Sequence, residues 1–316
     1  MSATRSARLR ALAKINLDLR VLSRRPDGYH ELRTIFQTIS LADSLQIAFT
    51  PHRQSSIRLL DDPIPDNLVL RAAQAVMDTV RRAGRVEMRL TKRIPMGAGL
   101  GGGSSDAAAV LLALPVLAGA EVPLADLCRI GRDLGSDVPF FLLGGTAVGI
   151  GRGTELFPLP DAPALPGLLV APGIHVSTAE AYRLLSARLT TELQENKIVS
   201  FQSQAWEWGE GQRRVNDFEP VVFQRHPRLA RLKKRLQQSG AVSAMMTGSG
   251  SAVFGFYRTA DETSRALASL PQIAAAGGKG FRFSLVSRAR YRSIWRRALD
   301  EHTGANVWPL RSRYLR

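Results

Sequence analysis

The chain has 316 residues, of which 45% are hydrophobic and 22% charged, so wholesale disorder is excluded and a large core can be buried. Its single cysteine excludes an intramolecular disulfide, and the longest apolar run, Ala107–Ala120, is too short to span a bilayer. The net charge of +16 comes mostly from arginines spread along the chain, so it does not by itself define a nucleic-acid surface. No secretory leader is expected, because the first twenty residues lack a continuous apolar stretch, and we expect a cytoplasmic enzyme.

Alternation of apolar and polar residues predicts several strands in the first hundred residues. Ala13–Val21 has apolar residues on one face and polar residues on the other, which predicts a half-buried strand. Further strands are predicted at Thr34–Ile39, at Leu45–Phe49 and through Val86–Leu90.

Three helices are predicted in the same half of the chain. Asn67 is expected to cap a helix that runs to Val80 and is ended by Gly84. A second helix begins near Ser105, after a glycine-rich stretch, and a third covers Pro123–Leu134 and is stopped by Gly135.

A cluster of prolines at Pro158–Pro166 marks the expected domain boundary. After it, Ser177 and Glu180 form a capping-box pattern at the start of a helix, whereas residues near 190–215 give no clear pattern. The other predicted elements are strands at Leu168–Val170, Val242–Met246, Ala252–Tyr257 and Phe281–Val286 and a helix at Pro227–Gln238. This mixed order predicts an α+β protein with domains at 1–163 and 164–286 and a basic C-terminal extension at 287–316.

The extension carries an amphipathic helical pattern. Its apolar residues recur at helical spacing with arginines between them: Tyr291, Ile294, Trp295, Ala298 and Leu299. Such a helix can lie on a membrane surface, but we favour docking on the protein's own surface. The extension is also expected to be dispensable for chemistry, because every motif described below precedes it.

The strongest chemical signal is Pro95–Asp106, which reads PMGAGLGGGSSD and contains five glycines between Gly97 and Gly103. Glycines between a strand and a helix let backbone N–H groups approach a phosphate, and the helix N-terminus adds partial positive charge. Ser104 and Ser105 offer hydroxyls to the phosphate or to its metal ion. A phosphate site is therefore favoured over a purely structural turn, since ordering so many glycines costs conformational entropy.

Two other glycine motifs fit less well. Gly97, Gly99 and Gly102 satisfy the dinucleotide-binding pattern G-x-G-x-x-G, with Glu121 about twenty residues later. That pattern belongs in an opening βαβ unit, however, and here a long segment of different character precedes it. A Walker A loop is excluded, because no lysine follows the glycines.

The glycine stretch resembles the second motif of the GHMP kinase superfamily, whose common form is P-x-x-x-G-L-G-S-S. The additional glycines before Ser104 are similar to one branch of that superfamily, whose substrate is a cytidylyl compound. Three further segments support that branch and occur in its order: Ala13–Leu17 with Arg25–His30, Gly135–Phe140 and Met246–Phe254. The resemblance covers nearly the whole chain to about Val286.

The resemblance implies a two-domain GHMP kinase fold, with a ribosomal-protein-S5-domain-2-like N-terminal domain and a ferredoxin-like C-terminal domain. It implies ATP-dependent phosphorylation of the 2-hydroxyl of 4-diphosphocytidyl-2-C-methyl-D-erythritol in the non-mevalonate isoprenoid pathway, with Mg²⁺ accompanying ATP. The expected partners are these small molecules, without nucleic acid or a membrane span. The alternatives are another GHMP kinase or a basic nucleic-acid-binding protein.

The resemblance also assigns catalytic roles, to Asp137 and to its partner Lys14. The residues alone leave other interpretations open, namely a helix cap for Asp137 and a solvated strand face for Lys14. No metal ligands can be assigned, because the five histidines lack metal-ligand spacing and no H-E-x-x-H motif occurs.

For ATP, the resemblance implies contacts with Asn67 and Lys92 and with the whole loop: Pro95, Met96, Gly97, Ala98, Gly99, Leu100, Gly101, Gly102, Gly103, Ser104 and Ser105. For the cytosine base it implies Tyr29 and His30, with Tyr182 on the opposite side of the base, and the alternative for Tyr182 is a core residue of its helix. The remaining substrate-binding residues that it implies are Asn16, Thr178, Gly248 and Gly250, the last two in a turn that could also be a plain hairpin bend.

Overall fold

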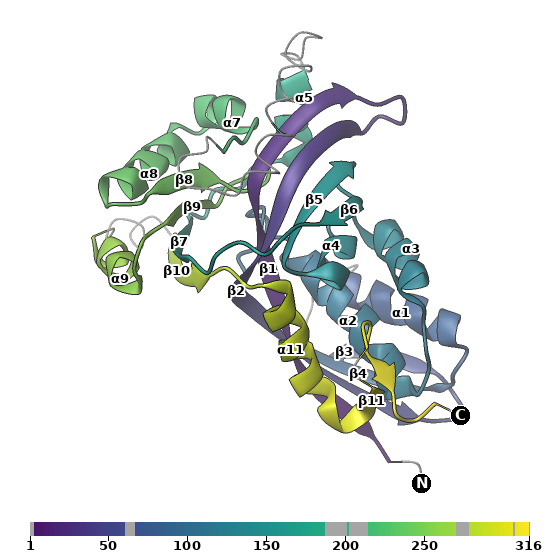
Figure 1. Cartoon of the computed structure of the whole chain (residues 1–316). Coiled ribbons are helices and arrows are strands. Elements are labelled where there is room, and N and C mark those ends of the chain that lie inside the picture. The colour runs from purple at the N-terminus through teal and green to yellow at the C-terminus, as the bar shows by residue number, and fades with distance from the viewer. Residues whose placement is uncertain are drawn as a thin grey trace.

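The computed structural model describes residues 3–60, 67–186, 201, 214–269, 278–305 and 307–315. Two sheets with their covering helices form an α+β architecture, and a C-terminal segment packs along the first of them (Figure 1). The strands of the first sheet are β1 (Arg5–Arg24), β2 (His30–Pro51), β3 (Ser56–Leu60), β4 (Gly84–Thr91), β5 (Thr146–Gly151) and β6 (Glu155–Pro158). Those of the second are β7 (Pro166–Ala171), β8 (Ser243–Met246), β9 (Val253–Phe256) and β10 (Lys279–Ser284).

We call the first sheet with its helices the first part of the molecule, and the second sheet with its helices the second part. The described helices of the first part are α1 (Leu68–Val80), α2 (Gly102–Ala118), α3 (Leu124–Leu134) and α4 (Val138–Leu143). Those of the second part are α5 (Thr178–Ser186), α7 (Glu219–Arg225), α8 (Pro227–Gln238) and α9 (Ala260–Ala268). The C-terminal segment comprises α11 (Arg288–Leu299), the 3₁₀ helix η1 (Asp300–His302) and the short strands β11 (Thr303–Ala305) and β12 (Arg311–Ser312).

A long antiparallel hairpin of β1 and β2 dominates the first sheet, whose strand order is β3-β4-β2-β5-β6 with β1 paired to β2. The prediction of two separate strands at Thr34–Ile39 and Leu45–Phe49 is wrong, because both belong to β2. The pairing with β1 shifts register between Leu12 and Lys14. This irregularity interrupts the apolar alternation without ending the strand.

The prediction of a half-buried strand at Ala13–Val21 is also wrong. Both faces of β1 are buried in this stretch, and Lys14 and Arg20 are each only 4% exposed. The reason is that segments distant in sequence cover the polar face: the Asn16 backbone N–H donates to Thr247 Oγ1 and Asp18 Oδ2 accepts from the Val215 N–H. The polar face of β1 therefore lines the junction between the two parts of the molecule.

Local capping explains where α1 begins. Asn67 caps α1 as predicted, since its Oδ1 accepts from the Val69 N–H at 2.9 Å. The helix ends at Val80 with Arg81, which has φ +49°, as its C-cap, and Gly84 begins β4 instead of ending the helix. Helix α2 is buried on all sides from Ser105 onward, and α3 ends at Gly135 as predicted.

The second sheet has the order β10-β7-β9-β8 and contains all four strands predicted there. The Ser177 hydroxyl accepts from the Glu180 N–H at 3.3 Å at the start of α5, and α8 matches the predicted helix. Most of the segment near 190–215 lies outside the described residues. The last strand of the first sheet ends at Pro158 and the first of the second begins at Pro166, while the division at 163/164 stays a prediction.

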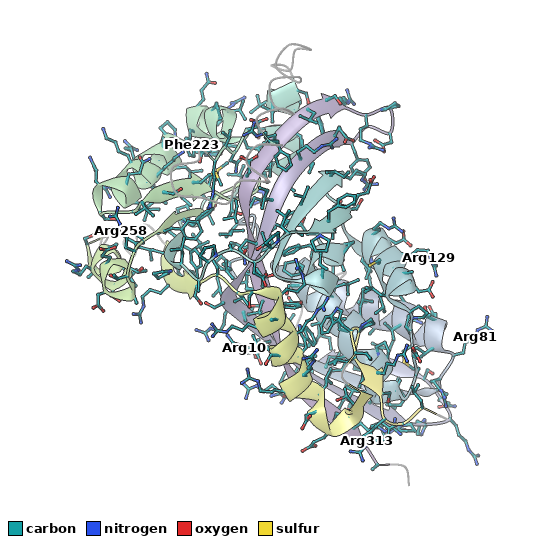
Figure 2. The ribbon with its side chains drawn as sticks, viewed as in Figure 1. Arg10, Arg81, Arg129, Phe223, Arg258 and Arg313 are labelled. Carbon is teal, nitrogen blue, oxygen red and sulfur yellow. The ribbon has the colours of Figure 1, made fainter. Side chains whose placement is uncertain are left out.

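Docking of the extension on the protein's own surface is confirmed. Tyr291, Trp295 and Leu299 of α11 are buried in the same hydrophobic core as α2 and α4. Within the described part of the chain, no helix has the length and apolar character needed to cross a membrane. Arginines lie at different sides of the molecule, as Arg10, Arg81, Arg129 and Arg258 illustrate (Figure 2).

Candidate active site

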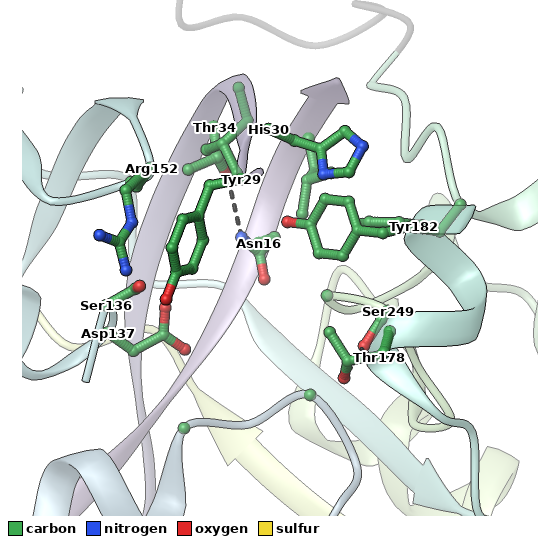
Figure 3. A pocket seen from close by; sticks show the side chains of 18 of the residues that line it. Asn16, Tyr29, His30, Thr34, Ser136, Asp137, Arg152, Thr178, Tyr182 and Ser249 are labelled. Carbon is green, nitrogen blue, oxygen red and sulfur yellow. Dashed lines mark hydrogen bonds between the residues drawn. The ribbon is translucent and has the colours of Figure 1, made fainter. Parts of the chain in front are cut away.

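A cleft of about 1100 Å³ lies where the two parts of the molecule meet. Its walls come from β1, β2, the glycine loop, the residues before α4, helix α5 and the turn between β8 and β9 (Figure 3). The cleft thus joins four of the segments that the sequence motifs singled out.

Lys14 and Asp137 face each other in this cleft. Lys14 Nζ lies 3.3 Å from Asp137 Oδ2 and donates to Asn16 Oδ1 at 2.8 Å. The alternative of a solvated face for Lys14 is wrong, because its side chain is 5% exposed. The cap alternative for Asp137 is wrong as well. Asp137 precedes α4 but has α-helical backbone angles and no side-chain capping bond, so its carboxylate is directed to Lys14 instead.

A buried network fixes the orientation of Asn16. Its Nδ2 donates to Thr34 Oγ1 at 2.7 Å, and the Thr34 hydroxyl donates in turn to the Asp18 carbonyl at 2.7 Å. Since the amide nitrogen is engaged in this way, Oδ1 is directed to Lys14. The sequence did not reveal Thr34 or Thr247, because threonine on a strand carries no chemical signature.

The glycine loop has the conformation that a phosphate-binding loop needs. Gly97, Gly99 and Gly101 have φ of +64°, +78° and +67°, in the left-handed region. A Cβ at Gly99 would lie 2.3 Å from the Thr247 carbonyl oxygen, so only glycine fits there. The first bond of α2 runs from the Ser105 N–H to the Gly101 carbonyl, and the amides of the preceding turn have no intrahelical acceptor.

Only part of the loop faces the cleft. Gly99, Gly101 and Ser104 line it, whereas Ala98 and Leu100 are buried in the core. The expectation that the Ser105 hydroxyl serves a phosphate or metal ion is wrong, because it is buried and donates to the Leu12 carbonyl at 2.7 Å.

Lys92 belongs to a buried cluster behind the loop. Its Nζ lies 2.5 Å from Asp43 Oδ2 and 2.6 Å from Asp106 Oδ2. Burial raises the pKa of the Asp106 carboxyl to about 7, although the charge of Lys92 opposes this shift. The Asp43 carboxylate also accepts from the Ile94 N–H at 2.8 Å. The cluster therefore joins β2, the end of β4 and α2, and Lys92, like Asn67, is not among the residues that line the cleft.

Aromatic side chains stand at the outer end of the cleft. The His30 and Tyr182 rings stack at 4.6 Å with an interplanar angle of 23°, and Phe218 packs edge-on against Tyr182. Tyr29 is 51% exposed and carries the Arg152 guanidinium 3.4 Å above its ring. Figure 3 shows Tyr29 and Tyr182 on opposite sides of the opening.

Of the substrate-binding residues predicted in the second part, some line the cleft and others do not. Thr178 and Gly248 line the cleft, and the Thr178 hydroxyl shares a hydrogen bond of 2.8 Å with Ser249. Gly250, with φ +95°, belongs to the turn behind them and is not a lining residue.

The charges of the lining favour anionic ligands. Among the described residues, Lys14, Arg24, Arg152 and Arg183 line the cleft, and Asp137 contributes the one carboxylate. Burial, together with Arg24, lowers the pKa of His30, so the imidazole is neutral near pH 7. Burial, together with the Asp137 charge, raises the pKa of Tyr182 to about 12, so this phenol stays protonated. The sequence did not identify the three arginines, because arginine is common throughout the chain.

Among the residues that the structure describes, no three histidine, cysteine, aspartate or glutamate side chains come together as ligands. The cleft does combine a glycine loop at a helix N-terminus with an ion pair between the buried Lys14 and the partly exposed Asp137. This combination is suited to holding a phosphorylated donor and accepting the proton of a hydroxyl.

These features define a small-molecule kinase, and the chain belongs to the GHMP kinases. Residues 67–145 match the N-terminal domain of the GHMP kinases and residues 204–275 match their C-terminal domain. Within that family the chain is a member of the 4-diphosphocytidyl-2-C-methyl-D-erythritol kinases. It is 66% identical over 319 residues to the kinase of that name from Solibacter usitatus, covering 99% of each chain.

More distant relatives agree with this assignment. The 4-diphosphocytidyl-2-C-methyl-D-erythritol kinase of Citrifermentans bemidjiense is 42% identical over 275 residues, which is 85% of this chain and 95% of the relative. A crystal structure of 4-(cytidine 5'-diphospho)-2C-methyl-D-erythritol kinase superposes with a TM-score of 0.74 at 37% identity, covering 88% of this chain and 98% of that one. The homoserine kinase of Cytophaga hutchinsonii shares the fold, with a TM-score of 0.68 at 17% identity.

Proposed function

We propose that this chain transfers the γ-phosphoryl group of ATP to the 2-hydroxyl of 4-diphosphocytidyl-2-C-methyl-D-erythritol, in the cytoplasm, as a step of the non-mevalonate isoprenoid pathway. The observation that carries the proposal is the contact of 3.3 Å between Lys14 and Asp137, in one cleft with the glycine loop. The relative of 66% identity supports the choice of substrate.

ATP phosphates are assigned to the glycine loop. The free amides at the start of α2 and the partial positive charge of the helix favour an anion there. The cluster of Lys92, Asp43 and Asp106 supports the loop from behind, because it joins the strand before the loop to the helix after it. In this proposal Lys92 and Asn67 act on ATP through the position of the loop and of α1, rather than from the lining of the cleft.

Mg²⁺ is expected to accompany ATP. Ser104, Ser136 and Asp137 present side-chain oxygens in the cleft, and hard oxygen donors are what Mg²⁺ prefers. The donor set therefore fits an ion that takes most of its ligands from phosphate and water. When bound, such an ion neutralises charge on the phosphates.

The acceptor hydroxyl is assigned to the Lys14–Asp137 pair. In this assignment the Asp137 carboxylate accepts the hydroxyl proton, while Lys14 holds the carboxylate in place and offers positive charge to the transferring group. Asn16 orients Lys14 through the hydrogen bond of 2.8 Å. Positioning of this kind supplies most of the catalysis in phosphoryl transfer.

The cytidylyl end of the substrate is assigned to the aromatic end of the cleft. A base can stack on an aromatic ring. The Ser186 hydroxyl donates to the Tyr182 carbonyl, so His30 Nε2 donates to Ser186 Oγ, and His30 Nδ1 is left as an acceptor for the base edge. Because His30 and Tyr182 are in direct contact, we propose that the base enters beside this pair, toward Tyr29, and not between its two rings. Arg24, Arg152 and Arg183 supply positive charge for the diphosphate.

The test is a phosphorylation assay with the purified full-length chain. ATP is supplied with 4-diphosphocytidyl-2-C-methyl-D-erythritol, with mevalonate or with homoserine, and product is identified by mass spectrometry and ³¹P NMR. We expect a phosphate monoester of the first compound only. Turnover of mevalonate or homoserine would indicate another GHMP kinase, and no turnover, together with tight binding of RNA or DNA, would overturn the kinase proposal.

A further inference from the structure

Asp137 stands at the beginning of α4, a helix of only six residues. In any helix the last four backbone carbonyls lack intrahelical partners, so a helix this short depends on other segments to satisfy them. A single turn of helix is also marginal by itself. The position of Asp137 is therefore set by whatever holds α4.

Two carbonyls of α4 are satisfied by the C-terminal extension. Tyr291 Oη donates to the Phe141 carbonyl at 2.5 Å, and Trp308 Nε1 donates to the Leu142 carbonyl at 2.9 Å. Tyr291 is buried, which raises the pKa of its phenol, so the hydroxyl remains a proton donor. The extension thus supplies the caps that α4 cannot provide for itself.

The extension also packs tightly against the end of α4. A Cβ at Gly144 would lie 2.3 Å from Cδ1 of the Tyr291 ring, so the ring lies directly against the backbone. Arg288 donates from its side chain to the Leu159 carbonyl at 3.3 Å, and its N–H donates to Asp161 Oδ1 at 2.8 Å. Figure 1 shows α11 running along the first sheet beside this region.

The opposite side of α4 contacts the phosphate loop. A Cβ at Gly101 would lie 2.9 Å from Cζ of Phe141 and 3.2 Å from Cγ of Lys14. The Phe141 ring is thus in contact with the loop, while its carbonyl accepts the bond from Tyr291. Phe141 therefore connects the extension to the glycine loop.

We infer that Tyr291 is a positioning residue for phosphoryl transfer: its hydrogen bond to the Phe141 carbonyl fixes α4, and thereby sets Asp137 against Lys14 and the glycine loop. This inference rests on the proposed function, which gives Asp137 its catalytic role. The extension is then part of the catalytic apparatus, contrary to the expectation that it is dispensable for chemistry.

The experiment compares two tyrosine-to-phenylalanine variants in the full chain. Tyr291→Phe removes the hydroxyl that holds α4. Tyr257→Phe is the matched control, because Tyr257 is also buried and shares a hydrogen bond of 2.9 Å with Ser239, away from the cleft. Each variant is made in the wild-type chain and in the Asp137→Asn chain. kcat and both KM values are measured at a temperature at which circular dichroism shows every variant fully folded.

In the wild-type background we expect Tyr291→Phe to lower kcat about tenfold with both KM values unchanged, since displacement of a catalytic group by a fraction of an ångström has effects of this order. Tyr257→Phe should lower thermal stability by a similar amount and leave kcat within about twofold. In the Asp137→Asn background, Tyr291→Phe should have little further effect on kcat, because the group that it positions is already lost.

Equal kcat values for Tyr291→Phe and Tyr257→Phe would overturn the inference, and so would an undiminished tenfold loss in the Asp137→Asn background. If Tyr291→Phe does not fold, Trp308→Phe, which removes the bond to the Leu142 carbonyl, is subject to the same expectations. If the wild-type chain phosphorylates a different acceptor, the proposed substrate fails, and the same comparison is made with that acceptor.

Discussion

In the proposed mechanism Asp137 is the proton acceptor, and its side chain makes no capping bond to α4. Asp137→Asn is therefore expected to lower kcat by about 10²–10⁴-fold, the usual size of a general-base contribution, with both KM values little changed. The melting temperature should change little, because the side chain is 32% exposed and makes no capping bond, and Lys14 keeps its bond to Asn16. Steady-state kinetics and thermal denaturation measure the two effects.

The control for this variant is Asp133→Asn, which changes an exposed aspartate of α3 and should leave kcat unaltered. Lys14→Met should also lower kcat, and the double variant should lose less than the product of the two single losses, because the pair acts as a unit. A folded Asp137→Asn enzyme with wild-type kcat would show that Asp137 is not the proton acceptor.

Tyr182 combines a contact with the cleft and a contact with the core of the second part. Tyr182→Ala is expected to raise KM for the cytidylyl substrate about tenfold or more, because stacking of a base on an aromatic ring contributes about 1–3 kcal/mol. KM for ATP should stay nearly constant, since the glycine loop lies at the other end of the cleft. Tyr182→Phe retains the ring and should behave as wild type, and equal losses for both substrates would leave Tyr182 as a core residue only.

At the scale of the element, the start of α2 is the proposed phosphate site, and a substitution at Gly103 tests this proposal. Gly101 is less suitable, because its φ of +67° and the nearby Phe141 ring would strain any side chain. Gly103 is exposed, and a Cβ there meets only Leu68 at 3.7 Å. We expect Gly103→Asp to raise KM for ATP about tenfold or more, since like charges about 4 Å apart near a protein surface repel by about 4 kcal/mol.

Gly103→Asn is the matched control, because it has the same shape without the charge. An acidic residue in the first turn of a helix is itself stabilising, so Gly103→Asp should melt no lower than Gly103→Asn. If Gly103→Asp has a higher KM for ATP than Gly103→Asn but melts no lower, the cause is repulsion of the phosphates and not damage to the fold. If the two variants have the same KM for ATP, the phosphates do not bind at the start of α2.

For the whole molecule, the extension forms part of the main core. Deletion of residues 287–316 removes Tyr291, Trp295 and Leu299 from that core, and truncation of one large buried side chain alone costs about 2–5 kcal/mol. The free energy of unfolding lost with all three side chains therefore approaches the total stability of a typical protein, about 5–15 kcal/mol. We expect the deletion to give insoluble protein or protein without a cooperative unfolding transition.

Soluble yield, circular dichroism and thermal denaturation test this expectation. Arg290→Ala serves as the control, because Arg290 lies on the exposed face of α11 and should affect none of these measurements. A deletion variant that is soluble, melts as the full chain does and keeps its kcat would show that the extension is an independent appendage.

Local patterns in the sequence predicted many of the secondary elements and identified candidate chemical groups. Four features can be recognised because each depends on neighbouring residues. They are the alternation of apolar and polar residues in β1, the Asn67 cap, the glycines before α2 and the helical spacing of apolar residues in α11. The motifs around Lys14, Tyr29 and Asp137 were recognised through their resemblance to a known family, and the structure places these three residues in one cleft.

The tertiary structure alone decided which of these groups are buried and what they contact. Burial of the polar face of β1, the cluster around Lys92 and the capping of α4 by Tyr291 all join segments far apart in the chain. The pattern of apolar residues in one segment indicates whether that segment is a helix or a strand. It does not indicate which distant segment covers the face that carries the polar residues. For this reason Lys14 resembles a solvated strand residue in the sequence and is a buried partner of Asp137 in the folded chain.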